Sequence, residues 1–204
     1  MAKDNRAACK LCRRERQKLF LKGDRCSSPK CSFESRNYPP GQHGAAPSRP
    51  TEYGRRMREK QKARRTYGLS ERQFSSLFAT AVRKRGVTGD ILFELLERRL
   101  DNVVFRLGYG QSRREARQMV RHGHVRVNGK KVNIPSYQCK AEEAIALAPK
   151  KLDRVRDRLK DFNPPAWLLL DENSLEGKLS RVPGGEDAVG SGIEYSLIVE
   201  YYSQ

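Results

Sequence analysis

The stretch from Ser112 to Val132, SRREARQMVRHGHVRVNGKKV, determines much of what this chain can be. Seven of its residues are Arg or Lys, and its one acidic residue is Glu115. Ser112 followed three positions later by Glu115 has the form of a helix-starting capping box, and Gly123 is the residue type that ends a helix in a left-handed conformation. The pattern predicts one helix between these two positions.

The predicted helix has two different faces. Its apolar residues recur at the spacing of a buried stripe, at Ala116, Met119 and Val120. Its arginines at four-residue spacing share another face, which we expect to point outward: Arg113, Arg117 and Arg121. An outward row of this kind is suited to contact with a phosphate backbone.

A β-hairpin is predicted directly after this helix. His124–Val127 alternates polar and apolar residues as a half-buried strand does, and Asn128-Gly129 is typical of a type I′ turn. Lys130 and Lys131 then begin the return strand. We expect the helix N-terminus, the arginine row and the hairpin to form one phosphate-binding surface. Ordinary surface arginines are the alternative, but that interpretation leaves the lack of acidic partners unexplained.

The charge of the chain indicates a polyanionic partner. The 204 residues carry a formal net charge of +18, and the excess of Lys and Arg lies in the first two thirds of the sequence. The 37% of hydrophobic residues suffices for a lean core in one or two domains. No apolar run approaches the roughly 20 residues that span a bilayer, and the N-terminus, MAKDNRAACKLC, lacks the apolar stretch of a secretory signal. We therefore expect a cytoplasmic protein that does not enter membranes.

Four of the five cysteines fall within residues 9–31, in two pairs with metal-ligand spacing. Two residues separate Cys9 from Cys12, and four separate Cys26 from Cys31. In a reducing compartment such pairs favour a metal over disulfides, and four thiolates close a tetrahedral zinc site with no position for water. We therefore expect one structural zinc ion here. The alternatives are an iron–sulfur cluster, reduced thiols in a disordered arm, or replacement of one thiolate by His43.

The segments after the cysteines are predicted to form an arm and a basic helix. Residues 37–50, NYPPGQHGAAPSRP, contain four prolines and favour an extended arm. Thr51–Tyr67 is predicted to be a helix that is polar and basic almost all round. Because Glu59 is the only acid between Gly54 and Arg65, its self-repulsion favours a contact with RNA over a solvated face.

The core is expected from the segments that follow. Ser70–Gln73 again has capping-box form and starts a helix that stops at Gly86, and residues 90–107 supply two short helices with most of the hydrophobic mass. Cys139 is expected to be a small buried side chain on a strand. Residues 184–192 are glycine-rich and are expected to form a loop, without the Gly-Lys-Ser/Thr ending of a nucleotide-binding loop.

The stretch Ser112–Val132 resembles the RNA-binding motif named after small-subunit ribosomal protein number four, which also occurs in pseudouridine synthases and tyrosyl-tRNA synthetases. Further segments resemble the bacterial small-subunit (30S) ribosomal protein number four family in its zinc-binding, four-cysteine form. The similarity runs nearly from end to end. These segments are the cysteines at 9–31, YPPGQHG at 38–44, YGLSERQF at 67–74, ERRLDNVVFRLG at 97–108 and LIVEYYS at 197–203.

The resemblance implies an α+β fold in three parts. A zinc-stabilised N-terminal arm occupies residues 1–45, and residues 46–89 and 183–204 form a mainly helical domain. An inserted RNA-binding module of helices and antiparallel strands occupies residues 90–182, with the helix-hairpin motif at 112–132. Ile193–Tyr201 alternates as a strand would, but the family has a C-terminal helix there, and a helix is what we expect.

The resemblance also implies a structural component of the small ribosomal subunit, with no catalytic activity. In similar proteins, basic surfaces bind the 5′ domain of 16S ribosomal RNA at a multi-helix junction and nucleate early assembly. The family lies beside neighbouring ribosomal proteins, near the opening through which messenger RNA enters. An RNA-modifying enzyme or a stalled-ribosome binder with the same motif is the alternative, but no nucleophile, paired acids or open metal site is obvious outside residues 90–182.

The candidate RNA-binding residues fall in three groups. On the arm they are Tyr38, Gln42 and His43. On the first basic helix they are Arg55, Arg56, Arg58, Lys60, Lys62, Arg64 and Arg65. On the inserted module they are Ser112, Arg113, Arg114, Arg117, Arg121, His122, His124, Arg126, Lys130 and Lys131. Binding is expected to depend on charge and RNA shape more than on reading bases.

Overall fold

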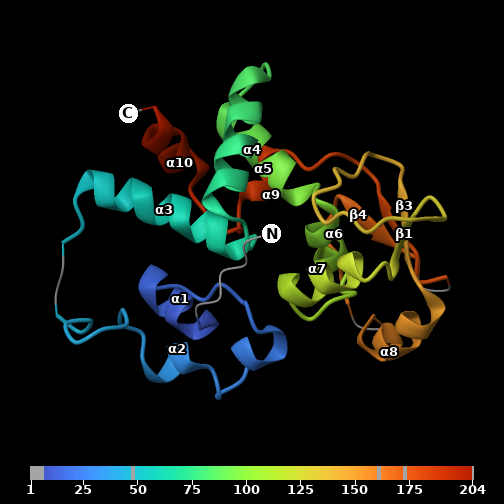
Figure 1. The fold of residues 1–204 in the computed structure, drawn as a ribbon, viewed down its shortest axis with the longest axis horizontal. Coiled ribbons are helices and arrows are strands. Elements are labelled where there is room, and N and C mark those ends of the chain that lie inside the picture. Colours follow the sequence, from blue (N-terminus) through green and yellow to red (C-terminus); the bar gives the residue numbers. More distant parts are fainter. Residues whose placement is uncertain (1–6, 47–48, 160–161, 172–173, 204) are drawn as a thin grey trace. The chain divides into compact units, whose positions relative to one another are not determined.

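The computed structural model describes residues 7–46, 49–159, 162–171 and 174–203, and the chain divides into two compact units (Figure 1). Unit 1 contains residues 1–93 and 187–204, and unit 2 contains residues 94–186. The sequence placed these boundaries after residues 89 and 182. It also treated residues 1–45 as a separate arm, whereas the structure groups this segment with unit 1.

The N-terminal part of unit 1 consists of short helices joined by turns. They are α1 (Ala8–Glu15), a 3-10 helix (Gly23–Cys26) and α2 (Ser32–Ser35). A small apolar cluster holds this part together, formed by Ala8, Leu11, Cys12, Leu19 and Leu21 with Phe33 packed against it. The residues after it, 37–46, contain no helix or strand, as the prolines and glycines predicted.

The rest of unit 1 is helical. Its helices are α3 (Glu52–Thr66), α4 (Glu71–Arg83), the start of α5 (Thr88–Glu97) and α10 (Tyr195–Tyr202). The capping box at the start of α4 is confirmed, because Ser70 Oγ accepts the Gln73 N–H at 3.3 Å and Gln73 Oε1 accepts the Ser70 N–H at 3.2 Å. The buried face of α4 carries Phe74, Phe78 and Ala81.

The C-terminal segment is a helix, as the family resemblance implied and the strand-like alternation did not. Tyr195, Ile198 and Tyr202 recur at helical spacing, so that one face of α10 packs on the other helices of unit 1. The Tyr202 ring stacks on Phe78 with centroids 4.3 Å apart, and Tyr195 meets the edge of Phe93 at 5.6 Å. Because these three side chains pack on one side, the segment forms a helix despite its alternating polar and apolar pattern.

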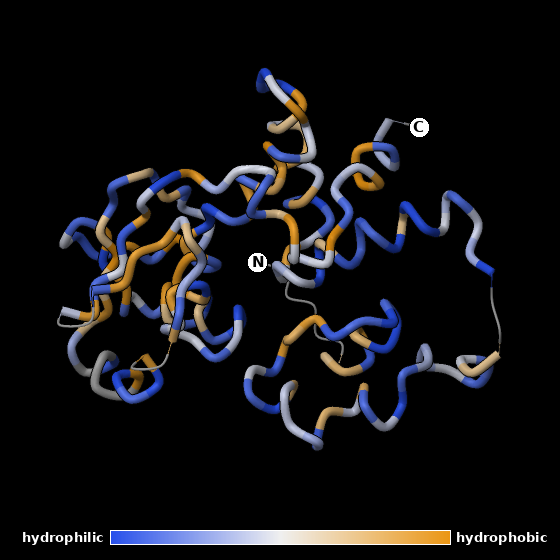
Figure 2. The backbone as a smooth tube through the Cα atoms, turned by 180° about the vertical axis from the view of Figure 1, so that it is seen from behind, coloured by the Kyte–Doolittle hydropathy of each residue, from blue (hydrophilic) through white to orange (hydrophobic). Residues whose placement is uncertain are grey.

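Unit 2 combines helices with one antiparallel sheet in the order β2-β1-β3-β5-β4. Its helices are the end of α5, α6 (Leu100–Arg106), α7 (Arg113–Arg121) and α8 (Pro149–Leu159). Its strands are β1 (Val125–Val127), β2 (Lys130–Lys131), β3 (Ala144–Leu147), β4 (Leu168–Leu170) and β5 (Gly177–Leu179). Figure 2 shows apolar segments gathered inside this unit. The α+β class is therefore confirmed.

The core of unit 2 lies between α6, α7 and the sheet. Tyr109 is fully buried there, with its hydroxyl 2.8 Å from the Leu175 carbonyl oxygen and 3.1 Å from that of Ile145. Gly177 is required by close packing, because a Cβ atom at this position would lie 2.3 Å from Leu107 Cδ1. The hydroxyl thus contacts β3 and the segment before β5, and the glycine lets β5 pack against Leu107.

Two expectations about local structure are wrong. Cys139 is fully buried, but it follows an isolated bridge between Arg99 and Gln138 and lies outside any strand of the described residues. The glycine-rich segment 184–192 contains a one-turn helix, α9 (Gly185–Ala188). The short run Glu186-Asp187-Ala188 is compatible with a helical turn, and Gly190, with a φ of 96°, leaves it in the left-handed region.

No helix in the described ranges is long and apolar enough to cross a membrane. That finding agrees with the absence of a long apolar run in the sequence.

The cap of α4 generates a first prediction. Replacing Ser70 with Ala removes the acceptor of the Gln73 N–H and is expected to destabilise unit 1 by about 1 kcal/mol. The change is measured by urea denaturation followed by far-ultraviolet circular dichroism. Ser75→Ala, at an exposed position inside the same helix, serves as the control and should shift the free energy of unfolding by less than about 0.5 kcal/mol.

Candidate nucleic-acid interface

The helix α7 starts as the sequence predicted, but its N-terminus is less open than expected. Ser112 Oγ accepts the Glu115 N–H at 3.3 Å. The Glu115 carboxylate, however, accepts the Gln111 N–H at 2.7 Å, where a complete capping box would have it accept from Ser112. A carboxylate at this position repels phosphate, so it weakens the case for RNA binding by the amides of this N-terminus, which stays a prediction.

The arginine row of α7 does not all point outward. Arg113 Nε donates to Asn102 Oδ1 at 2.8 Å, and its guanidinium lies 4.5 Å from the centroid of the Phe105 ring. Arg117 donates to Asp101 Oδ2 at 3.2 Å. Burial of the guanidinium lowers the pKa of Arg117 below its usual value, and Asp101 offsets only part of this shift. Asp101 and Asn102 are buried polar residues of α6 that need partners. The expected outward row is therefore reduced to Arg121, which is exposed.

The hairpin after α7 has the predicted geometry. Asn128 and Gly129 have φ values of 48° and 77°, as a type I′ turn requires. Arg126 is exposed between two buried valines of β1, and it lies directly opposite Lys131 in the antiparallel register. Two like charges at directly opposed positions destabilise a hairpin, so the pair favours an anion that bridges them.

The hairpin also contacts the end of α7. Gly123 has a φ of 69°, and a Cβ atom here would lie 2.0 Å from Lys131 Cε. The lysine stem therefore lies over Gly123, and the positive φ of this residue is what favours glycine here. The His122 and His124 rings lie beside this contact, with centroids 6.0 Å apart. Desolvation lowers the pKa of His124, and Lys151, His122 and Lys131 lower it further.

The exposed basic residues of α7 and of the hairpin after it form what we call the basic hairpin surface. Its members are exposed, and none has an ion pair with a carboxylate of the described residues. They are Arg114, Arg121, Arg126, Lys130 and Lys131.

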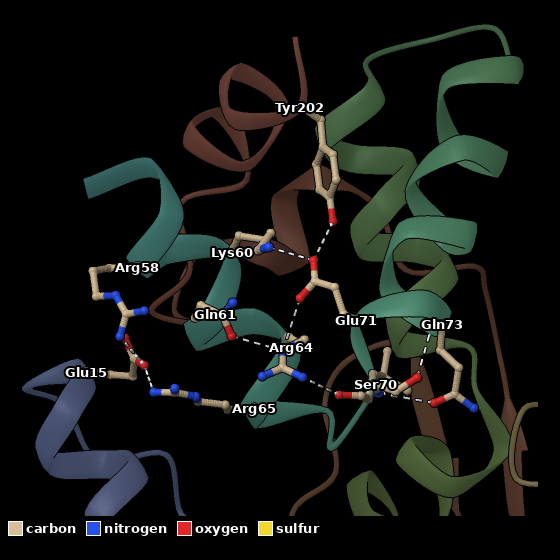
Figure 3. A network of polar contacts seen from close by, with 11 residues as sticks. Glu15, Arg58, Lys60, Gln61, Arg64, Arg65, Ser70, Glu71, Gln73 and Tyr202 are labelled. Atoms are coloured by element: carbon tan, nitrogen blue, oxygen red, sulfur yellow. Dashed lines mark hydrogen bonds and ion pairs between the residues drawn. The ribbon is translucent and has the colours of Figure 1, made fainter. Parts of the chain in front are cut away.

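The basic helix α3 has the opposite environment, because every one of its Lys and Arg side chains has a carboxylate partner. Figure 3 shows the part of this network around Glu71 and Glu15. Glu71 accepts Lys60 Nζ at 2.6 Å and the Tyr202 hydroxyl at 3.3 Å, and it lies 3.5 Å from Arg64 Nε. Lys60 is only 4% exposed, and its ammonium also lies 4.5 Å from the centroid of the Tyr201 ring.

Glu15 holds two further cations of α3 from the side of α1. Its side chain is 1% exposed, and it pairs with Arg58 at 3.4 Å and with Arg65. Its other oxygen, Oε2, is buried and has no hydrogen-bond partner among the described residues. A carboxylate buried in this way is stabilised chiefly by the two guanidinium groups.

The remaining pairs give every cation of α3 a carboxylate partner, with five carboxylates shared among seven cations. Arg55 pairs with Glu52 at 3.3 Å, Arg56 with Glu200 at 2.8 Å, and Lys62 with Glu59 at 2.6 Å. The expectation of unrelieved repulsion along this helix is therefore wrong. Tertiary structure brings in carboxylates from α1, α4 and α10, which the local sequence does not reveal.

The arm candidates are attached to α1. Arg13 Nε donates to the Tyr38 carbonyl oxygen at 2.9 Å and its guanidinium lies 4.9 Å from the centroid of the Tyr38 ring, while Arg14 donates to the Pro40 carbonyl oxygen at 3.2 Å. Gln42 and His43 follow as exposed residues in a turn. The two hydrogen bonds thus attach the arm to α1, and its candidate residues remain exposed to solvent.

The four N-terminal cysteines line one small pocket, together with Ala8, Leu21, Lys22 and Phe33. The Lys22 N–H donates to Cys26 Sγ at 3.3 Å, and burial raises the pKa of Cys12. Within the described residues, no group of three or more His, Cys, Asp or Glu side chains is arranged closely enough to hold a metal ion. The fold therefore gathers the thiols around one cavity, although it does not bring them to a formed coordination site.

The chain is similar to known proteins along its whole length. Residues 3–97 match the model of the ribosomal protein S4/S9 N-terminal domain, and residues 98–145 match the S4 domain. The chain is 52% identical over 207 residues to the small ribosomal subunit protein uS4 of Dictyoglomus turgidum, covering all of both chains. It is also 52% identical over 202 residues to the small ribosomal subunit protein uS4 of Thermus thermophilus, covering 96% of each chain.

The buried network of α3 generates a second prediction. Replacing Glu15 with Ala leaves Arg65 buried without its carboxylate and is expected to destabilise unit 1 by about 3 to 5 kcal/mol. Far-ultraviolet circular dichroism follows the loss of helix in urea. The single tryptophan, Trp167, lies in unit 2 and reports that unit separately by fluorescence.

A matched control tests whether the loss of stability depends on burial of the carboxylate that is removed. Glu52→Ala removes a carboxylate that is 68% exposed, and it should cost less than about 1 kcal/mol. Equal effects of the two substitutions would contradict the structural role assigned to Glu15.

Proposed function

This chain belongs to the uS4 family of small ribosomal subunit proteins, and we propose that its basic hairpin surface binds the 5′ domain of 16S ribosomal RNA at a multi-helix junction. It is a structural, non-catalytic component of the small subunit that carries an RNA-binding S4 domain. Its partners are 16S ribosomal RNA and neighbouring proteins of the small subunit.

One observation supports the proposed site above all others. The basic hairpin surface concentrates exposed cations that have no carboxylate partner among the described residues, and its register places Arg126 directly opposite Lys131. Phosphate groups relieve this repulsion, and each contact releases counterions from the RNA. In the same chain every cation of α3 has a carboxylate partner, so the unpaired cations of the hairpin do not simply follow from composition.

The other candidates contribute in different ways. The cations of α3 can reach phosphate only by exchanging a carboxylate partner, so we assign this helix mainly to holding unit 1 together. Arg113 and Arg117 fix α7 on α6 through Asn102 and Asp101. The exposed Tyr38, Gln42 and His43 of the arm remain available for stacking and hydrogen bonds with unpaired RNA.

The proposed role in the subunit follows from this mode of binding. A surface that recognises converging phosphates binds a folded junction more tightly than separate strands, and so it stabilises the junction as it forms. We therefore propose that the protein nucleates early assembly of this region, near the opening through which messenger RNA enters.

We also propose that Cys9, Cys12, Cys26 and Cys31 hold one structural zinc ion. The residues fit the group, because the four thiols line a single small pocket and the Lys22 N–H is directed at Cys26 Sγ. Four thiolates would give zinc a closed, structural site. The apolar cluster beside the pocket is small, so a metal would add stability where hydrophobic burial is limited.

The RNA site is tested by its salt dependence. If the protein neutralises about 6 to 10 phosphates, its affinity for a 5′-domain transcript should fall ~10³- to 10⁵-fold between 50 and 200 mM salt. Arg121→Gln with Lys131→Gln should weaken binding on the order of 10- to 100-fold and lower the salt slope by about 1.4 to 1.8. Filter binding measures both. An unchanged affinity and slope in this variant would rule out the basic hairpin surface.

The zinc site is tested by elemental analysis of the purified protein. About one zinc ion per chain is expected, and Cys26→Ser should lose it together with the ordered structure around the pocket. Cys139→Ser is the matched control, because this thiol belongs to unit 2 and is not among the residues that line the pocket, and its loss should leave the metal content unchanged. Iron with visible absorbance would show that the ion is not zinc.

A further inference from the structure

Two of the chain's three histidines lie among the cations of the basic hairpin surface. His122 follows the last residue of α7 and His124 precedes the first residue of β1, so that only Gly123 separates them. Their ring centroids are 6.0 Å apart. His122 is exposed and His124 is half-buried, so a ligand on this surface can reach both rings.

The fold determines where the backbone of both histidines lies. The His122 N–H donates to the Gln118 carbonyl oxygen at 3.0 Å, and the His124 N–H donates to that of Met119 at 3.0 Å. The His124 carbonyl oxygen accepts the Ala148 N–H at 2.8 Å, which connects it to the residue before α8. These hydrogen bonds hold the two imidazoles at one place on the surface before any ligand binds.

Positive groups from three elements face this pair of rings. Arg121 comes from the end of α7, Lys131 from β2 and Lys151 from α8. A Cβ atom at Gly123 would lie 2.8 Å from Lys131 Nζ, so the ammonium lies over the backbone between the two histidines. Within the described residues, no carboxylate forms an ion pair with these three cations.

This environment disfavours a proton on the imidazole of the free protein. Desolvation is the main cause of the lowered pKa of His124, and the charges of Lys151, His122 and Lys131 lower it further. A phosphate group on the same surface reverses the sign of the local field. An imidazolium then gains Coulombic attraction and donates hydrogen bonds from both ring nitrogens, which a neutral imidazole cannot do.

We infer that RNA binding at the basic hairpin surface is coupled to proton uptake by His122 and His124, so that affinity rises as the pH falls. The inference rests on the proposed function and adds a regulation of that site by pH. Among side chains, histidine is the one whose ordinary titration range includes physiological pH, so small changes of the field alter its charge.

The direction of the pH dependence follows from linkage. Binding of phosphate raises the pKa of His124 from its lowered value in the free protein. The contribution of this proton to affinity is therefore fully present below the pKa of the free protein, and it is lost as the pH rises through the pKa of the complex. The sensitive range lies around the ordinary titration range of histidine.

The test measures filter binding of the full chain to a 5′-domain transcript at constant salt. Between about pH 8 and about pH 6, affinity should rise on the order of 10-fold. His122→Gln with His124→Gln keeps hydrogen-bonding side chains that do not titrate, and this double variant should lose most of the rise. Its loss of affinity should be larger at about pH 6 than at about pH 8. His43→Gln is the control, because it removes the third histidine and should retain the rise.

Proton uptake is measured directly by titration calorimetry. Heats of binding near pH 7 in two buffers with different ionisation enthalpies should show about one to two protons taken up by the unaltered chain, and close to none by the double variant. Protons bound by the RNA bases contribute equally to both proteins, so the difference reports the two histidines. Circular dichroism at each pH should be the same for the variants and the unaltered chain.

Two results would overturn the inference. An equal rise of affinity in the unaltered chain and in the double histidine variant would show that the protons bind elsewhere. If affinity does not change with pH while Arg121→Gln with Lys131→Gln still weakens binding, the proposed function stands and the inference fails. If the Arg121 and Lys131 substitutions have no effect either, the basic hairpin surface is not an RNA site and both proposals fail.

Discussion

The structure of unit 1 depends on carboxylates that neutralise α3 from other elements. Glu15 of α1, Glu71 of α4 and Glu200 of α10 reach a helix that has seven basic side chains. Without them α3 could not lie within a packed unit, because cations removed from water need either a partner or continued solvation. The same ion pairs connect α3 to α1, α4 and α10, beside apolar packing such as that of the fully buried Ala63.

In unit 2, basic side chains without carboxylate partners occur beside buried ion pairs. Two of its buried acids lie in α5 and α6, where Glu97 pairs with Arg106, and Asp101 with Arg99 and Arg117. No carboxylate of the described residues forms an ion pair with the cations of β1 and β2. A chain with one strongly positive net charge thus has a helix in unit 1 whose cations all have carboxylate partners, and an exposed basic surface in unit 2.

Sequence reasoning predicted local features well where a signal lies within a few residues. The Ser70 cap, the Asn128-Gly129 turn and the left-handed Gly123 all follow from residue type and spacing, and the structure confirms each. The family resemblance supplied the helix at the C-terminus, which the alternation alone would have missed. The recognised family is confirmed by the comparisons.

The expectations that failed concern partners distant in sequence. Glu15 is separated from Arg65 by fifty residues, and no local pattern connects them. Arg113 and Arg117 have the spacing of an outward row, but buried polar atoms of α6 turn them inward. A charge pattern therefore predicts where cations lie on a helix, and only the fold determines whether water, a carboxylate or RNA faces them.

The helix α1 directs consecutive side chains to three different places. Cys12 lines the thiol pocket, Arg13 and Arg14 hold the arm at Tyr38 and Pro40, and Glu15 reaches α3. Each residue of a helix is rotated by about 100° from the one before. One residue inserted between Cys12 and Arg13 would rotate Arg13, Arg14 and Glu15 by about 100° relative to Cys12. The pocket, the arm and α3 could then not all be reached at once, which constrains the length of this short helix.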